Sequence, residues 1–131
     1  MNSIVELIKK LNKEQKDAVL STEGPNLIVA GAGSGKTRVL TTRLMHIIDK
    51  KKAFPNQILC VTFTNKAAKE MQNRVMQHIK GSTNSIPWLG TFHSISVKIL
   101  RRNAEALGYK SNFTILDTDD QKKLLRNIVK A

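Results

Sequence analysis

The chain has few acidic residues, one cysteine and no long run of apolar residues. Ten Asp and Glu stand against 22 Lys and Arg, a formal net charge of +12, so the surface favours polyanions, nucleic acid before an anionic membrane. Cys60 has no second cysteine with which to form a disulfide, and its apolar neighbours predict a small buried side chain. Charged residues interrupt the N-terminal segment, and no stretch approaches the ~18 apolar residues of a membrane span. We therefore expect a cytoplasmic protein with no membrane partner.

The apolar residues that are present suffice for a folded core. The 131 residues are 40% hydrophobic and 24% charged, which suits one ordinary domain. Three short apolar runs have the composition of buried strands, and each is followed by apolar residues at helical spacing. The predicted strands are residues 26–30, 57–62 and 88–89, and the predicted helices after them are 35–50, 65–79 and 91–107. This alternation predicts an α/β fold with a parallel sheet and helices on its faces.

Two further helices are predicted before the first strand. The earlier one covers residues 3–10, and the next opens at Asn12, whose spacing to Gln15 is that of a capping box. Asn65 is expected to cap the helix after the second strand, because its side chain can accept a backbone N–H bond. A polar stretch at residues 81–85 predicts the loop before the third strand.

The most informative segment follows the first predicted strand and opens the helix after it. It reads Ala30-Gly31-Ala32-Gly33-Ser34-Gly35-Lys36-Thr37, a P-loop in which Ala30 replaces the usual glycine. Glycines let the backbone approach phosphates, so that successive N–H groups and the helix N-terminus point at the anion. In such a loop Lys36 contacts the β- and γ-phosphates and Thr37 offers its hydroxyl to Mg²⁺. We therefore expect a bound nucleoside triphosphate with Mg²⁺.

Hydrolysis of that nucleotide needs more than the P-loop. It also requires an acid on Mg²⁺, a residue that positions water and usually an arginine finger. Among the later acids only Asp117 follows a strand-like run, so it is the candidate metal ligand. The simpler interpretation places it just before a helix that Thr118 and Gln121 open as a capping box, after Gly108 has ended the preceding helix. On this sequence the hydrolytic machinery is incomplete.

Three more segments accompany the P-loop in a fixed order. They read LNKEQKDAV from Leu11, TFTNKAAKEM from Thr62 and GTFHS from Gly90. With the P-loop they resemble the Q motif and motifs I, Ia and Ib of UvrD/Rep/PcrA-type superfamily 1 DNA helicases. The resemblance implies a RecA-like P-loop NTPase domain, of which residues 1–100 form the N-terminal portion. It also implies that residues 101–131 begin a helical inserted subdomain.

The same resemblance implies roles for single residues. Gln15 matches the glutamine that reads adenine, Arg38 matches an arginine near the base, and ATP becomes the expected nucleotide. The residues that it places along single-stranded DNA are Phe63, Thr64, Asn65, Thr91 and His93. Considered without the family, Phe63 fits a core aromatic as well as a base-stacking one. His93 equally fits a helix cap.

The first hypothesis is therefore an ATP- and single-stranded-DNA-binding N-terminal fragment of an ATP-dependent 3′–5′ DNA helicase involved in DNA repair or replication. The family's Asp-Glu motif, arginine fingers and second motor domain have no counterpart here, so we expect no turnover by this chain alone. The remainder of the helicase, if encoded separately, is the expected protein partner. Two alternatives stay open, a small stand-alone P-loop enzyme such as a kinase using Asp117, and a non-catalytic remnant of a split helicase gene.

Overall fold

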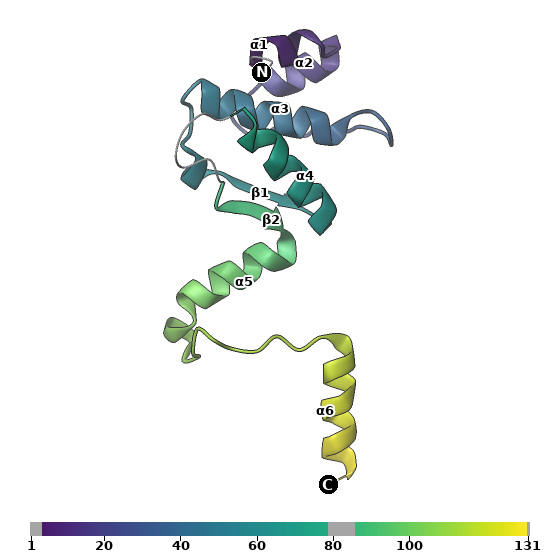
Figure 1. Cartoon of the computed structure of the whole chain (residues 1–131), viewed down its shortest axis with the longest axis vertical. Helices are drawn as coiled ribbons and strands as arrows, with labels where there is room; N and C mark the ends of the chain where they lie inside the picture. Colours follow the sequence, from purple (N-terminus) through teal and green to yellow (C-terminus); the bar gives the residue numbers. More distant parts are fainter. Residues whose placement is uncertain (1–3, 79–85, 131) are drawn as a thin grey trace. The chain divides into compact units, whose positions relative to one another are not determined.

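The computed structural model describes residues 4–78 and 86–130, and the chain divides into two compact units, Met1–Ile95 and Ser96–Ala131 (Figure 1). The first unit holds α1 (Ile4–Lys9), α2 (Lys13–Leu20), α3 (Lys36–Asp49), the 3₁₀ turn η1 (Pro55–Gln57), β1 (Leu59–Thr62), α4 (Asn65–Met76) and β2 (Trp88–Thr91). Helix α5 (Phe92–Asn103) begins in the first unit and continues into the second, which also holds η2 (Glu105–Leu107) and α6 (Thr118–Lys130). The predicted loop at residues 81–85 lies outside the described residues.

Strands β1 and β2 form a parallel two-stranded sheet, which confirms the predicted α/β class and two of the three predicted strands. The register pairs Leu59 with Trp88 and Thr62 with Thr91, so the two strands end at the same edge. Helix α4 connects the strands and packs against both of them. The short turn after β1 and the start of α5, which follows β2 directly, therefore lie at the same edge, where parallel sheets place their ligands.

The larger apolar core lies between this sheet and helices α3 and α4. Its buried members are Leu44, Met45, Cys60, Ala68, Met71, Val75, Ile86 and Leu89. Cys60 is buried as predicted, with its Sγ 3.3 Å from the Sδ of Met71, and burial raises the pKa of its thiol. A smaller cluster of Leu11, Val19 and Val39 joins α2 to α3. Both clusters fix α3, so the helix that follows the P-loop is anchored along its length.

The helix starts confirm one predicted cap and correct another. At α2, Asn12 Oδ1 accepts the N–H of Gln15 at 2.8 Å, and Gln15 Oε1 accepts the N–H of Asn12 at 3.1 Å, so the capping box is present. At α4 the cap is Thr64, whose hydroxyl accepts the N–H of Ala67, and Asn65 is the first helical residue. The prediction was one residue late because threonine and asparagine both cap helices, and the sequence offers them in succession.

The segment at residues 26–30, predicted as a buried strand, is not one. Within the described ranges its backbone is irregular and pairs with neither β1 nor β2. The side chains of Leu27 and Val29 are 91% and 89% exposed. A strand needs backbone hydrogen bonds to a neighbour that lies elsewhere in the sequence, and a local apolar pattern does not specify that neighbour.

In the second unit, the predicted helix 91–107 ends earlier and differently from the prediction. Helix α5 stops at Asn103, the 3₁₀ turn η2 follows, and Gly108 caps that turn with a φ of 75°, in the left-handed region that glycine favours. The guanidinium of Arg101 lies 5.6 Å from the ring centroid of Phe113, within range of a cation–π contact. These contacts hold the chain between α5 and α6.

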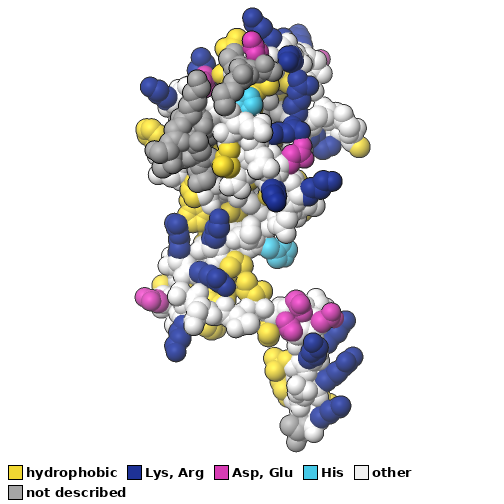
Figure 2. All heavy atoms as spheres, in the orientation of Figure 1, with side chains coloured by type: hydrophobic (Ala, Val, Ile, Leu, Met, Phe, Trp, Pro, Cys, Tyr) yellow, Lys and Arg dark blue, Asp and Glu magenta, His cyan; other side chains and the backbone are white. Residues whose placement is uncertain are grey.

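Helix α6 is amphipathic and begins differently from the prediction. Asp117 Oδ1 accepts the N–H groups of Asp119 and Asp120, at 2.9 and 2.8 Å, so Asp117 is the cap and the predicted box of Thr118 and Gln121 is wrong. An aspartate one position earlier already supplies the acceptor that the helix start needs. Figure 2 shows basic side chains along one side of α6 and hydrophobic ones along the other. None of the helices in the described ranges combines the length and apolarity that a membrane crossing requires.

Candidate functional site

The P-loop forms a glycine-rich turn at the start of α3. Gly33 and Gly35 have φ values of 75° and 83°, a conformation that other residues adopt only with strain. Gly35 stands at the N-cap position without a side-chain cap. In the described part of the chain, the N–H groups of Gly33, Gly35 and Lys36 have no hydrogen-bond acceptor. Unpaired donors at a helix N-terminus are the groups that bind phosphate oxygens in proteins.

Two carbonyl groups of the turn accept hydrogen bonds from within the protein. The Gly31 oxygen accepts bonds from Lys36 Nζ and Ser34 Oγ, each at 2.7 Å, and from the Ser34 N–H at 3.3 Å. The Ser34 oxygen accepts Gln15 Nε2 at 3.0 Å. Thr37 is exposed, and its hydroxyl makes no bond to any described residue. Two carbonyls of the loop are thus engaged in protein contacts, whereas three of its N–H groups and the Thr37 hydroxyl have no partner among the described residues.

The two residues predicted to lie near a nucleotide base occupy different surroundings. Gln15 reaches the P-loop through Ser34, as described above. Arg38 donates from Nη2 to the carbonyl of Lys10 at 3.4 Å, a bond that ties the start of α3 to the end of α1. Their roles toward a base stay predictions.

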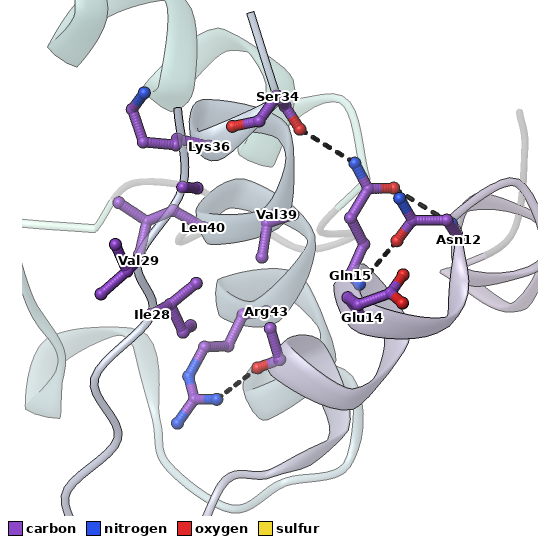
Figure 3. A pocket seen from close by; sticks show the side chains of 12 residues that line it. Asn12, Glu14, Gln15, Ile28, Val29, Ser34, Lys36, Val39, Leu40 and Arg43 are labelled. Carbon is purple, nitrogen blue, oxygen red and sulfur yellow. Dashed lines mark hydrogen bonds between the residues drawn. The ribbon is translucent and has the colours of Figure 1, made fainter. Parts of the chain in front are cut away.

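A pocket of about 430 Å³ opens between α2, residues 28–30 and α3 (Figure 3). It is lined by Asn12, Glu14, Gln15, Ala18, Ile28, Val29, Ala30, Ser34, Lys36, Val39, Leu40 and Arg43. Most of the wall is apolar, and Figure 3 shows Lys36 and Arg43 on well-separated parts of its rim. An apolar cleft with a few polar groups is typical of small-ligand sites, and this one adjoins the P-loop.

A second group of candidate residues lies where β1 and β2 end. Phe63 follows β1 and is 91% exposed, so it is not the core aromatic that the sequence left open. Its ring centroid lies 5.4 Å from that of Phe92, with the planes tilted by 47°. Phe92 follows β2 and is itself half exposed. The paired strands thus present two adjacent aromatic rings on the surface, a form that suits stacking on nucleobases.

The polar candidates at this edge divide into structural and accessible side chains. Thr91 is 7% exposed, and its Oγ1 accepts the N–H of Ser94 at 3.2 Å, so its hydroxyl helps to form the start of α5. Thr64 caps α4 in the same way. Asn65 and His93 are exposed on the first turns of α4 and α5. The accessible amide and imidazole flank the two rings in sequence and can donate to phosphate oxygens.

Comparison with known families decides the affiliation. The sequence profile described as the UvrD/REP helicase N-terminal domain matches residues 11–131. The chain belongs to this family. The match begins in the segment that carries Gln15 and includes the P-loop and both strand ends, so every candidate residue above falls inside the UvrD/REP-type region.

Curated relatives agree with that assignment. The chain is 53% identical over 125 residues to the ATP-dependent DNA helicase PcrA of Staphylococcus epidermidis. It is 51% identical over 124 residues to the protein of the same name from Staphylococcus aureus. Both alignments cover 95% of this chain and 17% of the relative. The chain therefore corresponds to the N-terminal part of a UvrD/PcrA-type helicase and spans about a sixth of the length of these relatives.

The alternative of a small stand-alone P-loop enzyme depends on Asp117 as a metal ligand, and the structure shows Asp117 as a helix cap. That carboxylate accepts two backbone N–H groups through one oxygen at the start of α6. Negative charge at a helix N-terminus is favourable and fully explains an aspartate there. No group of three His, Cys, Asp or Glu side chains in the described ranges lies close enough to hold a metal ion. Asp117 therefore has a structural role at the start of α6, and its role as a metal ligand stays a prediction.

Sequence reasoning missed three residues that the structure brings into these sites. Phe92 lies against Phe63, and the register of β1 and β2 is the signal that would have paired them. Arg43 lines the pocket and donates from Nη1 to the carbonyl of Ala18 at 2.5 Å. It lies seven residues after Lys36, two turns along the same face of α3. Asn12 was seen only as a cap, yet it also lines the pocket.

Proposed function

We propose that this chain is the ATP- and single-stranded-DNA-binding N-terminal part of an ATP-dependent DNA helicase with 3′–5′ polarity, active in DNA repair or replication. The observation that carries the proposal is the P-loop, with its unpaired N–H donors beside an apolar pocket. In this reading the first unit is a portion of a RecA-like P-loop NTPase domain, and the chain from about residue 101 begins an inserted helical subdomain. The polarity and the pathway rest on the family alone.

The residues of the P-loop fit Mg-ATP. The N–H groups of Gly33, Gly35 and Lys36 would bind phosphate oxygens, and Lys36 would exchange its bond to the Gly31 carbonyl for one to phosphate. The exposed hydroxyl of Thr37 would face Mg²⁺, which supplies charge neutralisation at the phosphates when bound. The apolar wall of the pocket suits the base. These residues bind and orient the nucleotide, and none of them supplies the acid that hydrolysis needs.

Nucleotide binding is tested by titrating the purified chain with a fluorescent ATP analogue in the presence of Mg²⁺. Lys36→Ala should weaken binding by at least about tenfold, because it removes a charge-assisted bond worth ~1.5–3 kcal/mol. Lys69→Ala is the matched control, since this lysine is exposed on α4 outside the pocket. Unchanged affinity in Lys36→Ala would show that the P-loop does not hold the phosphates.

The aromatic pair supports the DNA-binding part of the proposal. Phe63→Ala should weaken binding of a fluorescent oligothymidine about fivefold or more, because stacking of one base on an aromatic is worth ~1–3 kcal/mol. Phe54→Ala is the control, because Phe54 is also exposed, at 67%, but precedes β1 instead of following it. Binding measured by anisotropy should weaken with salt in both variants. Equal losses in the two variants would mean that the protein surface attracts DNA by charge alone.

We also propose that this chain alone does not turn over ATP, and that a separately encoded remainder of the helicase, where one exists, completes the site. Phosphate release from Mg-ATP, followed with and without single-stranded DNA, should stay at the buffer rate. Turnover that is lost in Asp117→Ala would favour the small stand-alone enzyme instead. A chain that folds but binds neither nucleotide nor DNA would favour the non-catalytic remnant.

A further inference from the structure

Gln15 uses both ends of its side-chain amide within the protein. Its Oε1 accepts the N–H of Asn12 at 3.1 Å, which completes the capping box of α2. Its Nε2 donates to the carbonyl of Ser34 at 3.0 Å, nineteen residues away in the P-loop. Figure 3 shows the amide lying between the two, so that one side chain links the start of α2 to the P-loop.

The bond to Ser34 fixes a peptide group that matters for phosphate binding. A trans peptide holds its C=O and the following N–H in opposite directions, and no cis peptide occurs in the described ranges. Because Gln15 binds the Ser34 oxygen on the α2 side, the N–H of Gly35 points to the opposite side. That N–H has no acceptor in the described part of the protein. The bond from Gln15 therefore holds the same peptide group that carries one of the loop's unpaired donors.

A second observation ties the same two residues together. A Cβ placed on Gly35 would lie 3.3 Å from Gln15 Nε2, closer than most real Cβ contacts, and the φ of 83° already disfavours a side chain there. The absence of a side chain at Gly35 lets the Gln15 amide approach the loop. Glycine at this position thus allows the left-handed turn and also leaves room for the bond from Gln15 to Ser34, which we call the tether.

We infer that Gln15 is a positioning residue for the phosphate groups: it holds the Ser34–Gly35 peptide so that the Gly35 N–H faces the anion. The inference rests on the proposed nucleotide binding and goes beyond contact with the base. If a residue only contacts adenine, its substitution changes the affinity for nucleotides according to their base. A residue that orients the P-loop affects any ligand that carries the phosphate chain, including one with no base.

The test compares three ligands in the presence of Mg²⁺: ATP, GTP and inorganic tripolyphosphate, each titrated calorimetrically into the parent chain and Gln15→Ala. Loss of one neutral hydrogen bond predicts about a fivefold weaker affinity, equal for all three ligands. A loss confined to ATP, with GTP and tripolyphosphate unchanged, would overturn the inference while leaving the proposed function intact. If the parent chain binds none of the three ligands, the proposed function itself is overturned.

Two controls separate the tether from the helix cap. Asn12→Ala removes the acceptor of the Gln15 N–H but keeps Nε2 and its bond to Ser34, so it should weaken tripolyphosphate binding less than Gln15→Ala does. Gln15→Glu keeps an acceptor for the Asn12 N–H but cannot donate to the Ser34 carbonyl.

An NMR measurement without any ligand completes the test. In ¹H–¹⁵N spectra the amide resonance of Gly35 should shift in Gln15→Glu and Gln15→Ala, and shift less in Asn12→Ala. A Gly35 resonance that stays in place in both Gln15 variants, while each remains folded, would overturn the inference whatever the ligands do.

Discussion

The two candidate binding regions are held in place by different forces. The P-loop follows the unpaired segment 26–30 and keeps its shape through polar bonds to the carbonyls of Gly31 and Ser34. The ends of β1 and β2 are fixed by strand pairing, by the ring contact of Phe63 and Phe92, and by the apolar core beneath. A hydrogen bond contributes ~1 kcal/mol net, and a buried side chain contributes several times as much. The P-loop should therefore be adjustable in shape, and the surface at the ends of β1 and β2 should be rigid.

The largest effect is expected from the apolar core beneath β1 and β2. Met71 is 1% exposed in α4 and contacts Cys60, so Met71→Ala should lower the free energy of unfolding by about 2–5 kcal/mol. Met76→Ala is the control on the same helix, because Met76 is 44% exposed. Urea unfolding followed by fluorescence of Trp88, the one tryptophan of the chain, measures both. Similar losses at the two positions would mean that α4 does not depend on this core.

A smaller loss is expected when the P-loop backbone is disturbed. Gly35→Ala forces a side chain into the left-handed region, which costs ~1–2 kcal/mol, and brings its Cβ to 3.3 Å from Gln15 Nε2. Gly31→Ala is the matched change, since a Cβ there meets nothing within 4 Å. Chemical denaturation should place Gly31→Ala close to the parent chain and Gly35→Ala below it. Equal stability of the two variants would contradict the strained turn.

The smallest effect concerns His46, at the far end of the helix that begins at the P-loop. His46 is 7% exposed, and burial, followed by the charge of Lys50, lowers the pKa of its imidazole below the ordinary value of 6.5. The folded state thus disfavours protonation of the His46 imidazole. The contribution of neutral His46 to stability is therefore complete above about pH 6.5 and is lost as the pH falls toward the folded-state pKa.

Stability measured between pH 7.5 and 5.5 should therefore fall more steeply in the parent chain than in His46→Gln. The same change at exposed His93 controls for the loss of an imidazole. Parallel curves for the parent chain and His46→Gln would place the pH dependence elsewhere. A steeper curve for the parent chain would show that protonation of buried His46 destabilises the fold.

Some elements whose signals are local were predictable from the sequence, although the caps of α4 and α6 were each placed one residue late. The α2 capping box needs only Asn12 and Gln15 three residues apart, and both of its bonds are present. The left-handed turn of the P-loop was predictable because Gly33 and Gly35 are the residues that adopt this backbone conformation without strain. The strands at β1 and β2 were found because each apolar run is flanked by turn residues, although the start of β1 and the end of β2 were each misjudged by two residues.

Features that depend on distant partners were not predictable. Residues 26–30 have the same apolar character as β1, but no pattern within them states which strand they pair with. The pairing of Phe63 with Phe92 depends on a register between strands 26 or more residues apart, which only the folded sheet provides. The bond from Gln15 to Ser34 spans nineteen residues and was likewise absent from the prediction.

The exposed segment Leu27–Val29 has a consequence for how the chain behaves in solution. Its N–H and C=O groups make no backbone bond in the described part of the protein, and its side chains are β-branched or long and uncharged. Such a stretch is a template on which another extended strand can form. As the concentration rises, strand pairing between copies of the chain becomes more favourable, because it satisfies these backbone groups. The net charge of +12 opposes the approach of two copies at low salt. Raising the ionic strength screens this charge and should therefore promote self-association.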